Sequence, residues 1–205
     1  MSPKFSSIFT LSLAFSLAAC SPSSTPSAFH DVSYPDDDQI SAALDKQLSE
    51  DPQSSAAREL IRTMVGAEGK LRYQIKRVIF RQNAYEVHYD AALVMGQTGT
   101  QSLQTIYAEM IPESERAKLT RATLDTYEQW LNQHAENLKK DPAQRVQGEI
   151  LAESVSMLSK CYRQAQPDDE IVIMQGIAAM LLPEREGMYA EKLVMPHTSV
   201  SCLPL

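Results

Sequence analysis

The chain has 205 residues, with 19 lysine and arginine residues against 26 aspartate and glutamate residues, and a formal net charge of −7. An acidic chain argues against nucleic acid as a partner, because the phosphate backbone requires a basic surface. The same charge argues against electrostatic binding to an anionic bilayer. No cofactor is expected either, since the seven glycines are scattered singly and form no phosphate-binding loop.

The N-terminal segment is an apolar stretch that ends at a cysteine. After Lys4 the chain is mainly apolar up to Ala19, but this run is short and contains several serines. A transmembrane helix needs about 20 apolar residues, whereas a basic start, a short apolar middle and small residues before a cut are typical of a secretory signal. The residues Leu17-Ala18-Ala19-Cys20 resemble the lipobox of bacterial lipoproteins, in which the chain is cut just before the cysteine. An ordinary signal peptide with an incidental cysteine is the alternative.

The lipobox resemblance implies a diacylglycerol thioether on Cys20 and a further acyl chain, such as palmitate, on its amino group. Two or more chains give stable membrane anchoring. Ser21, in place of an aspartate, implies export to the outer membrane in Gram-negative members of the class. We therefore expect a signal peptide over residues 1–19, a lipidated cysteine with a flexible tether over 20–35, and one globular domain over 36–205.

Two short helices are expected at the start of the domain, over 39–48 and 52–65, because apolar residues recur there at helical spacing. Asp51 suits the N-cap of the second helix, Pro52 suits its first position and Gly66 suits its end. The predicted buried stripe of this second helix is Ala57, Leu60, Ile61, Met64 and Val65.

A hairpin is expected next, because the apolar period changes to two over residues 71–80 and 85–95. A turn between these strands places Val78 opposite Val87, so the apolar residues agree on one face. The alternation slips at Lys76, which predicts a β-bulge. A third strand is expected over 102–110, with a short helix as the alternative.

The second half of the chain is expected to contain a long helical pair. One helix covers 113–140, and Asp141 and Pro142 cap and open the next, which runs to Cys161 and Tyr162. The segment 171–182 fits either a strand or a helix, and 188–194 fits a strand. The resulting fold class is α+β: an antiparallel hairpin or three-stranded meander, with one or two C-terminal strands as an option. The long helical pair and the two short N-terminal helices would pack on it.

The polar face of the 85–95 strand carries the one cluster suited to chemistry. Glu86, His88 and Asp90 alternate along it, and residues two apart lie about 7 Å from each other on one side of a strand. A histidine with two carboxylates could bind a metal ion or carry out acid–base chemistry. Ordinary cross-strand ion pairing is the alternative, because Arg77 lies opposite His88 in the expected register and Arg81 is near.

The chain has none of the HExxH, GxSxG or SxxK motifs of common hydrolases. We therefore expect a non-enzymatic lipoprotein at the outer membrane that binds another envelope protein, as an assembly accessory, an inhibitor or an immunity factor. The alternative is an envelope hydrolase, or a metal or small-ligand binder, that uses Glu86, His88 and Asp90. A carrier of small ligands would need an enclosed apolar pocket.

Two cysteines remain once Cys20 carries lipid. Cys161 and Cys202 form an even pair in an oxidising compartment, so we expect a disulfide between them. It closes a loop of roughly 40 residues and contributes about 4 kcal/mol on the chain-entropy model. Two free buried thiols are the alternative.

Thiol titration of the denatured, unreduced protein tests this pairing. We expect no reactive thiol, because lipid blocks one cysteine and the disulfide blocks the other two. Two reactive thiols per chain would show that Cys161 and Cys202 are free.

Overall fold

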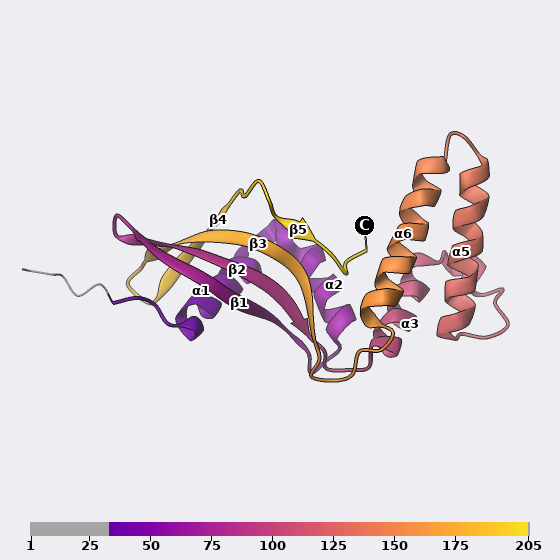
Figure 1. The fold of residues 1–205 in the computed structure, drawn as a ribbon. Helices are drawn as coiled ribbons and strands as arrows, with labels where there is room; N and C mark the ends of the chain where they lie inside the picture. Colours follow the sequence, from indigo (N-terminus) through magenta and orange to yellow (C-terminus); the bar gives the residue numbers. More distant parts are fainter. Residues whose placement is uncertain (1–32, 205) are drawn as a thin grey trace, which may run out of the picture. The chain divides into compact units, whose positions relative to one another are not determined.

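The computed structural model describes residues 33–204. The expected signal peptide, Cys20 and the tether up to residue 32 lie outside the described residues. The described chain has the predicted α+β class with an antiparallel sheet (Figure 1). Its helices are α1 (Asp37–Glu50), η1 (Pro52–Ser54), α2 (Ser55–Val65), α3 (Gly99–Met110), α4 (Glu113–Arg116), α5 (Leu124–Lys140) and α6 (Arg145–Tyr162). Its strands are β1 (Lys70–Arg81), β2 (Ala84–Val94), β3 (Glu170–Pro183), β4 (Met188–Leu193) and β5 (Ser199–Val200).

The sheet has the order β1-β2-β3-β4, and the short β5 pairs with β3. Each pairing is antiparallel. The predicted hairpin register is confirmed: Val78 lies opposite Val87, and the register shifts between Ile75 and Arg77, at the expected bulge. The ambiguous segment 171–182 is a strand, because it belongs to β3 and pairs along the whole of β2.

The prediction of a third strand over 102–110 is wrong, and the helical alternative is correct. A capping box begins α3, in which the Thr98 side chain accepts a hydrogen bond from the Gln101 backbone N–H. The Gln101 side chain in turn accepts one from the Thr98 N–H, at 3.0 Å. These two bonds satisfy amide groups that a helix start leaves free, so they favour helix over strand.

The predicted helix over 113–140 is also interrupted. Residues 117–123 are not helical and separate α4 from α5, and the Thr123 side chain caps the new helix start by accepting from the Thr126 N–H. Asp141 does not cap α6 directly, because its carboxylate accepts from the Ala143 N–H in a turn that precedes the helix. In both places a local side-chain bond to the backbone competes with continued helix.

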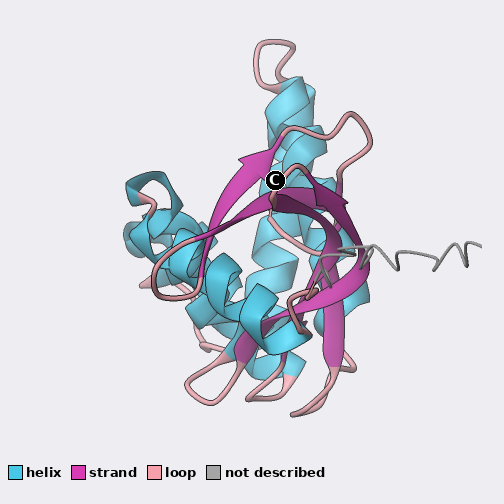
Figure 2. Ribbon diagram, turned by 90° about the vertical axis from the view of Figure 1, so that its left-hand side faces the viewer, coloured by secondary structure: helices cyan, strands magenta, loops and turns pink. Residues whose placement is uncertain are grey.

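The sheet curves around the two N-terminal helices. α1 contacts both edge strands, β1 and β4, which requires the sheet to bend around it (Figure 2). Ile40 and Leu44 of α1 are fully buried, as are Val87 of β2 and Leu181 of β3. This shared core positions α1 and α2 on the concave face.

The helices α5 and α6 pack against each other and against α3, rather than on the sheet as predicted. The Tyr107 hydroxyl of α3 donates to the Val155 carbonyl of α6 at 2.9 Å, inside this bundle. A disulfide joins Cys161 of α6 to Cys202, with a Cα–Cα distance of 5.7 Å, and so ties the bundle to the segment that follows β5. Of the helices in the described part, none is both long and apolar enough to cross a membrane.

Gly99, at the start of α3, provides a test of the contact between α3 and α6. A Cβ atom at this position would lie 1.7 Å from the Tyr162 carbonyl oxygen, so any side chain forces the two backbones apart. We expect Gly99→Ala to lower the free energy of unfolding by about 3 kcal/mol. The neighbouring Thr100→Ala, at an exposed position, should change it by less than about 0.5 kcal/mol in the same urea titration. Equal losses of stability in the two variants would show that the backbones of α3 and α6 are not in close contact at Gly99.

Candidate functional site

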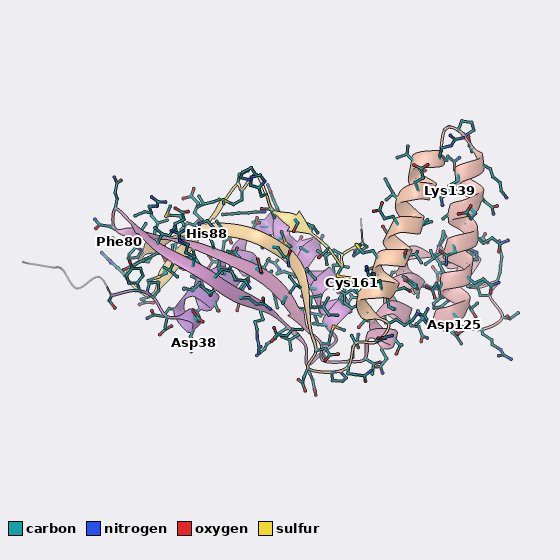
Figure 3. All side chains as sticks on the ribbon, in the orientation of Figure 1. Asp38, Phe80, His88, Asp125, Lys139 and Cys161 are labelled. Atoms are coloured by element: carbon teal, nitrogen blue, oxygen red, sulfur yellow. A yellow bond between two sulfur atoms is a disulfide. The ribbon has the colours of Figure 1, made fainter. Side chains whose placement is uncertain are left out.

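Figure 3 labels His88 on the sheet. Glu86 and His88 alternate with the buried Val87 and Tyr89 along β2, so they share the more exposed face of the strand, as predicted. The His88 Nε2 lies 2.6 Å from one Glu86 carboxylate oxygen, and the Arg81 Nε donates to the other at 2.9 Å. These hydrogen bonds, first that of His88 and then that of Arg81, lower the pKa of Glu86. Both oxygens of this carboxylate are therefore already engaged within the hairpin.

Asp90, the third member of the predicted cluster, has separate partners. Its carboxylate accepts a 3.0 Å hydrogen bond from the Gly176 N–H and forms an ion pair with Lys76 at 3.3 Å. Gly176 has a φ of +69° at an irregularity of β3, a conformation that suits glycine, and the bond from Asp90 supports it. No three histidine, cysteine or acidic side chains within residues 33–204 are grouped so as to hold a metal ion. The geometry therefore favours the ion-pair alternative for this cluster.

A different site lies on the opposite face of the sheet. A pocket of about 200 Å³ opens between the concave face and the helices α1 and α2. The side chains that line it are mainly apolar and come from α1, α2 and the three strands β1, β2 and β3. They include Leu44, Leu48, Leu60, Ile61, Tyr73, Tyr89 and Ile177.

Two tyrosines form one wall of this pocket. The rings of Tyr73 and Tyr89 pack edge to face, with centroids 5.6 Å apart and an interplanar angle of 83°. The Tyr73 hydroxyl donates to the Asp45 carboxylate at 3.0 Å, and burial together with the Asp45 charge raises the pKa of Tyr73. The Tyr73 hydroxyl is thus fixed to α1.

Tyr89 differs from Tyr73 in its hydroxyl. The residue is 7% exposed, and burial raises its pKa to about 12. Its hydroxyl makes no hydrogen bond to any residue between 33 and 204. No fully buried polar side-chain atom in that range lacks a partner, so this hydroxyl keeps some exposed surface, on a residue that lines the pocket.

The lining also includes two charged residues of opposite sign that reach solvent, Asp51 before η1 and Lys192 of β4, and these two define the mouth of the pocket. The pKa of Asp51 is lowered, chiefly by hydrogen bonds from the Ser54 hydroxyl and the Gln53 N–H. Both bonds hold the carboxylate in place, at 2.7 and 2.9 Å. The mouth is therefore polar, whereas the interior is apolar.

The C-terminal segment supplies a further wall, because Leu203 lines the pocket. The Ser201 N–H donates to the Ile173 carbonyl at 2.9 Å, and the Tyr162 hydroxyl donates to the Cys202 carbonyl at 2.8 Å. With the disulfide of Cys202, these bonds fix the two residues that precede Leu203.

The sequence analysis placed the whole apolar stripe of α2 in the core and did not predict the pocket. Of the predicted stripe, only Met64 and Val65 are buried, while Ala57 is exposed and Leu60 and Ile61 are half-buried. A stripe of helical spacing does not show whether its first turns meet a partner surface. No sequence signal identified the pocket.

Comparison with protein-family models, with curated proteins and with solved structures finds no match to this chain.

The raised pKa of Tyr89 predicts a loss of stability at alkaline pH. Between pH 10 and pH 12 the unfolded chain releases this proton and the folded chain keeps it, so stability falls as pH rises. Its share of the loss is roughly 2 kcal/mol by pH 12. Tyr89→Phe should therefore lose less stability over this range than the native chain, as measured by urea titration at each pH. The exposed Tyr189→Phe is the control for loss of a hydroxyl, and equal slopes for the native chain and Tyr89→Phe would refute the assignment.

Proposed function

We propose that the protein is a lipoprotein, anchored at the outer membrane through Cys20, that binds another envelope protein by receiving one of its apolar side chains in the pocket. The size of the pocket carries this proposal. Small-molecule sites usually enclose about 300–1,000 Å³, whereas an apolar cavity of about 150 Å³ holds a benzene molecule. The pocket, at about 200 Å³, therefore suits a single large side chain better than a whole ligand.

The charges at the mouth favour a polypeptide as the source of that side chain. A fatty acid or an anionic bilayer presents charge of one sign, whereas Asp51 and Lys192 present both signs. A polypeptide offers donors, acceptors and charges of both signs around an apolar anchor. Buried anchors of this kind, surrounded by a polar rim, dominate the energy of most protein interfaces.

The lipobox and the disulfide support the location. The residues Leu17 to Cys20 match the lipobox pattern, and a disulfide such as Cys161–Cys202 persists in oxidising compartments. The carboxylates of Glu86 and Asp90 are occupied by ion pairs and hydrogen bonds, so the hydrolase alternative receives no support from them. An assembly accessory, an inhibitor and an immunity factor all remain consistent with a protein-binding pocket.

Site-specific photocrosslinking in intact envelopes tests the proposal. Ala57 borders the pocket and is itself exposed, so a benzophenone amino acid in its place reaches a side chain docked in the pocket, whereas one in place of Ala56 is exposed on the same helix outside it. We expect a discrete crosslink from position 57 to an apolar side chain of one envelope protein, and at least tenfold less from position 56.

A second variant separates specific docking from chance capture. Leu60→Asp places a carboxylate in the apolar lining and should abolish the crosslink from position 57, because an unpaired charge resists burial. The melting temperature of this variant checks that it is folded. Equal crosslinking from positions 56 and 57, or none from either, would contradict the proposed function.

A further inference from the structure

The Tyr89 hydroxyl adds a chemical requirement to the apolar pocket. It belongs to a residue that is more than nine-tenths buried and that lines the pocket, it has no hydrogen-bond partner among the described residues, and it keeps some exposed surface. A tyrosine hydroxyl can both donate and accept a hydrogen bond. A purely aliphatic side chain would displace water from this hydroxyl without replacing the lost hydrogen bond.

The ring pair beside this hydroxyl favours an aromatic occupant. Tyr73 and Tyr89 already pack edge to face, and aromatic rings attract further rings in tilted or offset geometry because their faces are negative and their edges positive. The pocket volume of about 200 Å³ has room for one such ring system. Size, electrostatics and hydrogen bonding therefore point to the same class of group.

We propose that the pocket selects an aromatic side chain that carries one N–H or O–H group, which is an indole or a phenol, and that the Tyr89 hydroxyl recognises this group. The inference rests on the proposed function, since it names the anchor of the protein partner. Tyr73 contributes its ring but not its hydroxyl, because that hydroxyl already donates to Asp45.

Small probes test this selectivity without knowledge of the partner. Indole and indene have nearly the same shape, but only indole has an N–H group. We expect the full chain to bind indole about fivefold more tightly than indene in ligand-observed nuclear magnetic resonance titrations, the ratio that one net hydrogen bond provides. The pair p-cresol and toluene, which differ by a hydroxyl, should show the same order.

Four variants test whether the preference for indole over indene arises from the Tyr89 hydroxyl and whether the probes bind in the pocket. Tyr89→Phe keeps the ring and should bring the indole-to-indene ratio to about one, whereas Tyr73→Phe should keep the fivefold ratio because its hydroxyl is already bonded. Leu60→Asp places a carboxylate in the apolar lining and should abolish binding of both probes, whereas Ala56→Asp, at an exposed position outside the pocket, should leave both affinities unchanged.

Three results would overturn the inference: no binding of indole, equal binding of indole and indene, or a preference that survives Tyr89→Phe. These results are distinguishable from failure of the proposed function. If the crosslink from position 57 forms but indole does not bind, the proposed protein partner is supported and the proposed aromatic anchor is refuted. If indole binds selectively but position 57 gives no crosslink, the pocket has the stated selectivity and the proposal of a protein partner is refuted.

Discussion

Burial of the concave face of the sheet, with α1 spanning its two edge strands, is the constraint on which the rest of the structure depends. Val87 and Leu181 have no exposed surface, and they share a core with Ile40 and Leu44 of α1. Because α1 contacts both edge strands, the sheet must bend around it. The second helix, α2, contacts β1 and β2, and the pocket lies between the sheet and these two helices.

The alternation of apolar residues was sufficient to predict the hairpin, because a shift of one residue would turn every side chain to the wrong face. Val78 opposite Val87 and the bulge at Lys76 follow from this rule alone. Helix limits were harder to predict, because they depend on single side chains. Thr98 and Thr123 each begin a helix through a bond to the backbone, and such a bond has no periodic signal.

The candidate site was not predicted for a different physical reason. Glu86, His88 and Asp90 attract attention in the sequence because of their residue types, yet neighbouring strands neutralise them. The interior of the pocket consists mainly of ordinary core residue types, brought together from helices and strands far apart in the sequence. Tyr89 is distinctive because its hydroxyl lacks a partner among the described residues, which no local pattern encodes.

The central claim, that the pocket is the binding site of the molecule, is tested most directly by mapping. Backbone amide shifts of the folded chain, recorded while indole is added, report which residues meet the ligand. The account predicts changes confined to Ala57, Leu60, Tyr89 and Ile177 and their neighbours. Changes centred on α5 and α6, or on the face of β2 that carries His88, would contradict it.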